Sequence, residues 1–162
     1  PTERYYEEEG RAELTPRDFG ILMHRVFENA ATTDEIYTAI EAMTQDGVLD
    51  EKEAPRLREL VEKALADPVT AEWFGGRWQV VRNENEIILP GSGTTRRPDR
   101  VMTDGERAVV VDYKFGDRET ARHRKQIREY LRLLRQMGYT RTEGYLWYVR
   151  LGRTERVAEK ED

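Results

Sequence analysis

The sequence predicts an α/β protein in which a central mixed β-sheet is flanked by helices and preceded by an N-terminal helical segment. In the first half of the chain, apolar residues recur every three or four positions, which is the period of an amphipathic helix. From Trp78 onward the period becomes that of strands, with turn signals at Pro90-Gly91 and Asp104-Gly105. A long amphipathic helix and one more strand complete the order, which is typical of a layered α/β arrangement.

Three helices are expected in the first half. The first carries its apolar residues at spacings of four and three: Phe19, Met23, Phe27 and Ala30. A capping box running from Thr32 to Glu35 opens the second helix, which ends near Gly47. The third helix extends from about Glu53 to Ala66 and stops before Pro68. Packing of a core is the expected role of most of these residues.

The second half contains the expected sheet. Strands are predicted at 77–82, 84–89, 98–103 and 108–115. A helix over about 119–137 follows and ends at Gly138, and a last strand covers 142–150.

Length and composition are consistent with a single domain over residues 1–162, with a helical part at about 17–67 and a core at about 76–150. The chain lacks cysteine, which excludes disulfides, thiolate nucleophiles and iron–sulfur clusters and is consistent with a reducing, cytoplasmic setting. No apolar run approaches the roughly 20 residues of a membrane helix. The chain begins at Pro1 without a signal-like segment, so we expect a fragment of a longer chain.

The net charge of −5 conceals an asymmetry along the chain. Residues 1–67 carry 17 acids and 8 bases, whereas residues 68–162 carry 15 acids and 19 bases. An acidic protein of this kind can still present a basic working face.

The strand at 108–115 delivers charged residues at its end. Asp112 and Lys114 project to one face of this strand, and Val111 and Tyr113 project to the other. If the strand pairs with 98–103 as a hairpin, Asp99 comes close to Asp112. Two neighbouring carboxylates repel one another unless they are neutralised, for which a hard divalent cation such as Mg²⁺ is suited. The alternative is a surface hairpin with an Asp–Lys ion pair worth at most about 1 kcal/mol.

Four motifs in order resemble those of the PD-(D/E)XK nuclease superfamily. The core motif is Pro98-Asp99 followed by Asp112-Tyr113-Lys114, and it resembles the nuclease domains of RecB and AddA helicase–nucleases. The flanking motifs are Gly20-x-x-x-His24 and the Q-h-x-x-Y pattern from Gln126 to Tyr130. Phe115 departs from the small polar residue that is common at its position. The resemblance covers about residues 19–150 and implies a restriction-endonuclease-like core.

The resemblance also implies a site. Its metal ligands for Mg²⁺ or Mn²⁺ would be His24, Asp99, Asp112 and the carbonyl of Tyr113. Lys114 would orient the attacking water, and the products would carry 5′-phosphates. Gln126 and Tyr130 would brace the site or touch the nucleic acid. A glutamate often accompanies these sites, and Glu84 fits that position better than Glu86 by spacing.

The helix at 119–137 carries a stripe of bases at spacings of three and four. Its members are Arg118, Arg122, Lys125, Arg128, Arg132 and Arg135. Such a stripe is often only the solvated face of a helix. On a chain that is otherwise acidic, six aligned bases favour contact with a DNA backbone, which gives affinity without sequence preference.

The resemblance implies a DNA nuclease domain of an ATP-dependent helicase–nuclease in recombination and repair, exonucleolytic on DNA ends or single strands. ATP would serve only a UvrD-like motor in the same polypeptide, and a partner subunit is left open. One alternative is a catalytically silent DNA-binding or scaffold module, which the intact Asp–Asp–Lys set argues against. A stand-alone endonuclease of the superfamily is the other alternative.

Overall fold

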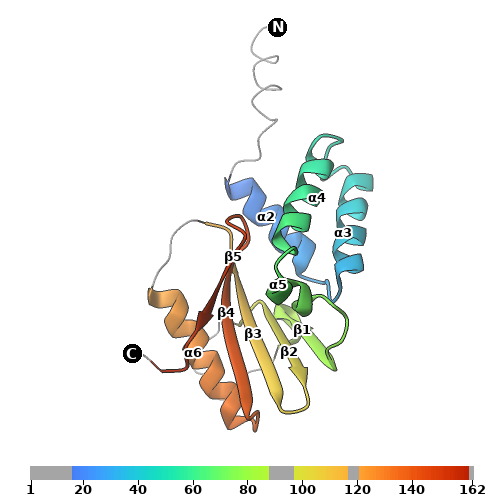
Figure 1. The fold of residues 1–162 in the computed structure, drawn as a ribbon. Coiled ribbons are helices and arrows are strands. Elements are labelled where there is room, and N and C mark those ends of the chain that lie inside the picture. The colour runs from blue at the N-terminus through green and yellow to red at the C-terminus, as the bar shows by residue number, and fades with distance from the viewer. Residues whose placement is uncertain (1–15, 88–96, 117–120, 161–162) are drawn as a thin grey trace, which may run out of the picture.

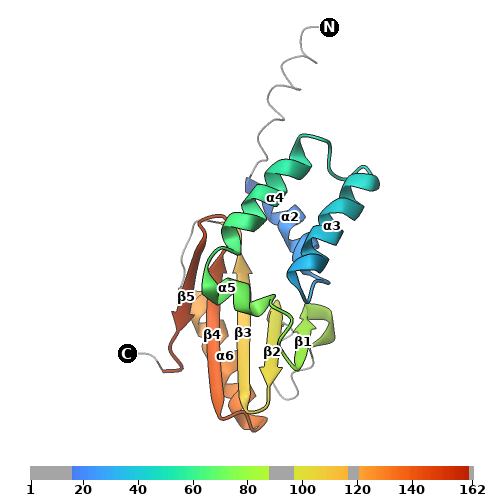
Figure 2. The ribbon, with the colours of Figure 1, turned by 45° about the vertical axis from the view of Figure 1, so that its right-hand side comes forward.

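The computed structural model describes residues 16–87, 97–116 and 121–160. Four helices come first: α2 (Pro16–Phe27), α3 (Thr33–Gln45), α4 (Glu53–Ala64) and α5 (Pro68–Trp73). Figures 1 and 2 show α2, α3 and α4 gathered at one end of the sheet, while α5 lies across one of its faces. Within the described residues, no helix is both long enough and apolar enough to cross a membrane.

The five-stranded sheet has the order β1-β2-β3-β4-β5. Its strands are β1 (Val80–Asn83), β2 (Arg100–Asp104), β3 (Arg107–Lys114), β4 (Arg141–Tyr148) and β5 (Arg153–Val157). All neighbouring strands are antiparallel except β3 and β4, which are parallel. Helix α6 (Ala121–Gln136) makes the crossover between them and covers the face opposite α5. The prediction of a mixed sheet flanked by helices is therefore confirmed.

Each face of the sheet has its own apolar core. Val111 and Tyr113 of β3 pack with α2, α3, α4 and α5 in one cluster. Ala108 and Val110 of the same strand pack with α6 in the other cluster. By alternation, Asp112 belongs to the face that α6 covers, opposite to Val111 and Tyr113.

The predicted cap of α3 is present in slightly altered form. Thr32 Oγ1 accepts a hydrogen bond from the N–H of Glu35 at 3.4 Å. The Glu35 carboxylate accepts from the N–H of Ala31, one residue before the cap, at 2.9 Å. Both donors at this helix start are thereby satisfied.

The sequence-based description differs from the structure at one predicted strand and lacks two elements, α5 and β5. Residues Glu84–Glu86 form a 3₁₀ turn, η1, where a strand over 84–89 was predicted, because Asn83 and Glu86 cap this turn reciprocally. The remainder of that predicted strand, 88–89, lies outside the described residues. The third helix does stop before Pro68, at Ala64, but Pro68 then occupies the first turn of α5, where the Asp67 carboxylate accepts from the N–H of Val69 at 2.8 Å. The edge strand β5 was not predicted at all.

Candidate active site

The two core aspartates meet at the end of β3 that faces α2. The register pairs Arg100 of β2 with Val111 of β3, so Asp99 lies beside Asp112. The N–H of Asp99 donates to Asp112 Oδ1 at 3.1 Å, and the N–H of Tyr113 donates to Asp99 Oδ2 at 2.7 Å. The Asp112 carboxylate is thus held by the backbone of Asp99, and the Asp99 carboxylate by the backbone of the residue that follows Asp112.

This proximity has an electrostatic cost. Burial raises the pKa of Asp99 to about 7, and the nearby Asp112 carboxylate adds to the rise. The hydrogen bond from Tyr113 and the nearness of His24 act in the opposite direction. Asp112 itself is only 3% exposed. Such a pair is stabilised in its fully ionised state by a cation between or beside its members.

Helix α2 brings His24 to the aspartates. Its Nε2 atom lies 3.8 Å from Asp99 Oδ1 and 3.5 Å from Glu84 Oε2, while Nδ1 lies 3.7 Å from Glu28 Oε2. The close approach of α2 requires a small residue one turn earlier, because a Cβ on Gly20 would lie 3.2 Å from Cβ of Phe115. The spacing Gly20-x-x-x-His24 therefore combines close packing with delivery of an imidazole.

Three side chains offer ligand atoms that all lie within 4.8 Å of one another: His24, Glu84 and Asp99. Two carboxylates and one imidazole fit a divalent cation such as Mn²⁺, and the carboxylates are ligands that Mg²⁺ prefers. The elevated pKa of Asp99 supports the same assignment, since a cation would favour its ionised form.

The group of His24, Glu84 and Asp99 overlaps only in part with the ligands that the sequence suggested. Glu84, expected only as a supporting residue, contributes an atom to the three-residue group. Asp112 is not a member of that group but lies beside it, bonded to the backbone of Asp99. Metal binding by Asp112 and by the Tyr113 carbonyl stays a prediction.

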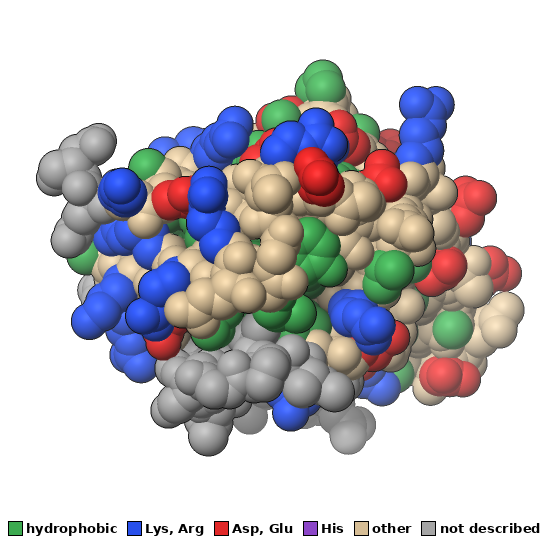
Figure 3. Space-filling view, turned by 90° about the horizontal axis from the view of Figure 1, so that it is seen from below, with side chains coloured by type: hydrophobic (Ala, Val, Ile, Leu, Met, Phe, Trp, Pro, Cys, Tyr) green, Lys and Arg blue, Asp and Glu red, His purple; other side chains and the backbone are tan. Residues whose placement is uncertain are grey.

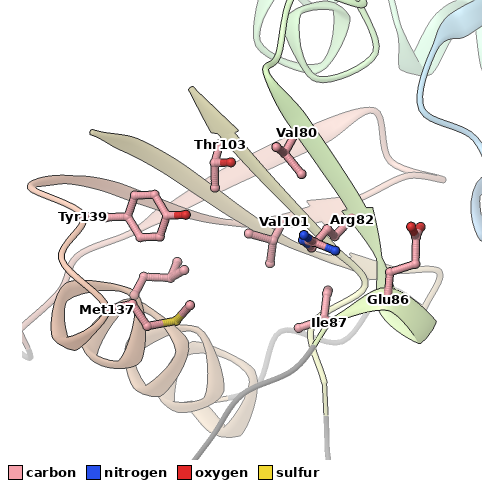
Figure 4. A pocket seen from close by; sticks show the side chains of 9 residues that line it. Val80, Arg82, Glu86, Ile87, Val101, Thr103, Met137 and Tyr139 are labelled. Carbon is pink, nitrogen blue, oxygen red and sulfur yellow. The ribbon is translucent and has the colours of Figure 1, made fainter. Parts of the chain in front are cut away.

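The turn η1 separates the roles of the two glutamates. The Glu86 carboxylate accepts from the N–H of Asn83 at 3.3 Å and so closes the turn. Glu86 also lines a cavity of about 290 Å³ between β1, β2 and the end of α6 (Figure 4). Glu84 points instead to His24, a distinction that the expected strand over these residues could not reveal.

The other residues of the predicted site lie on β3 and α6. Lys114 is half-buried at the end of β3, on the strand face of Asp112. Tyr130 is buried in the core beneath α6, and Gln126 lies one turn before it, partly exposed. The Gln126 Oε1 atom is buried and accepts no hydrogen bond from the described residues. The catalytic or bracing roles of Lys114, Gln126 and Tyr130 stay predictions.

The predicted basic stripe follows α6 away from the site. Of its members, Arg122, Lys125, Arg132 and Arg135 are exposed, Arg128 is half-buried, and Arg118 lies outside the described residues. Arg135 is matched by Glu159, with a nitrogen–oxygen distance of 2.7 Å, which reduces its free charge. In Figure 3, Lys and Arg gather on the α6 side and acids dominate the opposite side.

The structure combines a mixed sheet that has helices on both faces, a pair of neighbouring aspartates, and a lysine two residues after the second aspartate. This combination is typical of metal-dependent nucleases. The sequence matches the PD-(D/E)XK nuclease superfamily over residues 2–162, and the chain belongs to that superfamily. Its fold is accordingly the restriction-endonuclease-like one, and members of the superfamily use divalent metals. Among curated proteins, none matches this chain.

Proposed function

We propose that the chain is a DNA exonuclease domain of a helicase–nuclease that acts in recombination and repair. The observation that carries the nuclease assignment is the group of His24, Glu84 and Asp99 beside Asp112. The finer assignment rests on the resemblance of Gly20-x-x-x-His24 and of the Gln126-to-Tyr130 motif to RecB and AddA nuclease domains. In that setting a UvrD-like motor of the same polypeptide consumes ATP and feeds DNA to this site.

The cation, Mg²⁺ or Mn²⁺, would be held by His24, Glu84 and Asp99, with Asp112 as a further ligand. When bound, it supplies polarisation of the phosphoryl oxygen and stabilises the developing negative charge. Lys114 presents its ammonium group from the face of Asp112, where it orients the attacking water and balances charge on the phosphate.

The α6 stripe provides the path for the substrate. From Arg122 to Arg135 the helix rises about 20 Å, at 1.5 Å per residue. Exposed arginines and lysines along this length suit contact with successive phosphates of one strand, without reading of bases. The acidic layer formed by residues 33–64, which include α3 and α4, carries nine acids and four bases and lies away from α6 in Figure 1, where it repels a polyanion.

A cleavage assay tests the proposal. The purified chain is incubated with linear single-stranded and duplex DNA carrying an end label, with Mg²⁺, Mn²⁺ or a chelator. We expect metal-dependent release of short products from ends, no cleavage with chelator, and slower or no cleavage of covalently closed circles.

The decisive variants are Asp112→Ala and its isosteric counterpart Asp112→Asn. Both should abolish cleavage while DNA binding is largely retained. Asp104→Asn, an exposed acid at the far end of the β2–β3 hairpin, is the matched control and should cleave like the unaltered protein. Cleavage that persists in the Asp112 variants contradicts the assignment, and DNA binding without cleavage in the unaltered chain favours the scaffold alternative.

A further inference from the structure

The side chain of Arg100 is completely buried although it carries a permanent charge. Its exposed fraction is 0%, and its position follows Asp99 directly in the chain. Burying a guanidinium group is costly unless its donors are satisfied. Hydrogen bonds from Nη1 and Nη2 offset part of this cost, and they join β2 to α5 and to the segment that follows α2.

Three backbone carbonyls surround the guanidinium group. Nη1 donates to the carbonyl of Ala30 at 2.6 Å, and Nη2 donates to those of Ala31 and Trp73, both at 2.7 Å. The guanidinium carbon also lies 4.0 Å from the centre of the Phe74 ring. Planar donors in a fixed fork can bridge several acceptors in this way, which an ammonium group cannot do equally well.

The three acceptors belong to two segments. Ala30 and Ala31 lie in the connection between α2 and α3, just before the Thr32 cap, and Trp73 is the last residue of α5. A carbonyl at a helix C-terminus carries partial negative charge and favours a cation, so the guanidinium group also compensates the end of α5. Arg100 therefore fastens α5 and the segment that follows α2 to β2.

The carbonyl of Ala30 connects the segments that carry the three candidate ligands. Asn83 Nδ2 also reaches the carbonyl of Ala30, at 3.5 Å. Asn83 precedes Glu84, Arg100 follows Asp99, and Ala30 lies less than two helical turns after His24. Glu84 and Asp99 are thus sequence neighbours of the two residues that donate to the Ala30 carbonyl. His24 lies on the helix that leads to Ala30.

We propose that Arg100 is a positioning residue for the metal site: it fixes α2 against β2 and so sets the spacing between His24 and Asp99. This inference rests on the proposed function for its metal-binding part. The mechanical part, the attachment of α2 to β2, is independent of any nuclease activity. The two parts can be measured separately.

The mechanical part is measured by spin labels, for which the cysteine-free chain is well suited. Ile21→Cys on the exposed side of α2 and Asp104→Cys at the end of β2 receive nitroxide labels. Pulsed electron–electron double resonance measures the distance between the two labels. We expect a narrow distance distribution for the labelled parent and a clearly broadened one after Arg100→Lys. The same broadening is expected for Arg100→Met if that variant remains folded by circular dichroism.

The metal part is measured by Mn²⁺ titration, following the free-ion paramagnetic signal. Arg100→Lys should raise the Mn²⁺ dissociation constant at least tenfold. Val26→Ala is the control for general loss of stability. It shortens a buried apolar side chain of α2 that forms no hydrogen bond with the candidate ligands. At temperatures adjusted to equal fractional unfolding, it should bind Mn²⁺ within about twofold of the parent.

Each outcome decides between the two ideas. An unchanged distance distribution in Arg100→Lys overturns the attachment of α2 by this residue. A broadened distribution with unchanged Mn²⁺ affinity, or an equal loss in Val26→Ala, shows that Arg100 is merely structural. If the parent itself binds no Mn²⁺ and cuts no DNA, the proposed function fails and positioning of a metal site fails with it, while the distances still report whether Arg100 holds α2.

Discussion

The backbone N–H of Asp99 donates to the carboxylate of Asp112 at 3.1 Å, so one acid of the pair is bonded by the main chain of the other. A second main-chain hydrogen bond, from the N–H of Tyr113 to the Asp99 carboxylate at 2.7 Å, holds the other acid. These bonds fix two carboxylates side by side before any cation arrives. Preorganisation of this kind lowers the cost of assembling a charged site during the reaction.

Burial of Asp99, together with its proximity to Asp112, predicts a pH-dependent stability in metal-free protein. The pKa of Asp99 is about 7 in the folded chain, whereas the ordinary value is 3.8. Between these values the folded state retains a proton that the unfolded state has released, so the free energy of unfolding decreases as pH rises from about 4 to about 7. One such group contributes a slope of at most about 1.4 kcal/mol per pH unit. Urea denaturation in chelator at several pH values measures it.

Asp99→Asn isolates this contribution. The variant lacks the titrating group, so its stability should decline less over the same pH window than that of the parent. Saturating Mg²⁺ should also flatten the parent's decline, because the cation favours the ionised carboxylate. Equal slopes for parent and variant would show that Asp99 titrates near its ordinary value.

Substitution by glutamine should change the metal requirement at Glu84 but not at Glu86. Glu84→Gln removes a charged member of the group with His24 and Asp99, so the Mn²⁺ concentration for half-maximal cleavage should rise on the order of tenfold, or about 1.4 kcal/mol. Glu86→Gln leaves that group intact, and its amide oxygen can still accept from the N–H of Asn83. The metal requirement of Glu86→Gln should stay within about twofold of the parent. A reversed order would exclude Glu84 as a ligand.

How far the site could be predicted depended on strand geometry. Alternation and hairpin pairing were sufficient to place Asp99 beside Asp112, because a strand has only two faces and its turn was recognisable. Glu84 was harder, since alternation with Glu86 suggested a strand. The reciprocal cap between Asn83 and Glu86 produced a turn instead, and local side-chain bonds of this kind compete with strand pairing.

Other features had no signal that a single sequence exposes. Arg100 has a polar side chain in a strand, which suggests exposure, and its burial is favoured only because three carbonyls from segments distant in the sequence converge on it. The strand β5 alternates charged residues on an edge, a pattern that protects edges from aggregation but reads as a loop. The six-residue α5 was hidden by Pro68, which both ends one helix and begins the next.

Gly144 predicts a packing defect where α6 lies on β4. A Cβ at this position would overlap the Cγ2 atom of Ile127 and lie 3.1 Å from Leu131 Cδ1. Gly144→Ala should therefore lower the free energy of unfolding by about 1–3 kcal/mol. In an Ile127→Ala background, which removes the overlapping atom, the same change should cost less. Thermal denaturation of the four proteins measures this coupling, and additive effects would contradict direct overlap.

The basic stripe on α6 predicts a salt-dependent contribution to DNA binding. Arg128→Ala with Arg132→Ala removes two bases from the stripe, so affinity for single-stranded DNA should fall and the slope of log K against log salt should flatten by about 1.4. Arg56→Ala with Arg58→Ala is the matched control, because both arginines are exposed on α4, in the acidic layer. Fluorescence anisotropy at several salt concentrations, in chelator so that no cleavage occurs, gives both slopes. The control should retain the parent's slope, since a contact with phosphate releases counterions only where the DNA lies. Equal flattening in both pairs would show a response to net charge alone, and an unchanged slope in the α6 pair would place the DNA elsewhere.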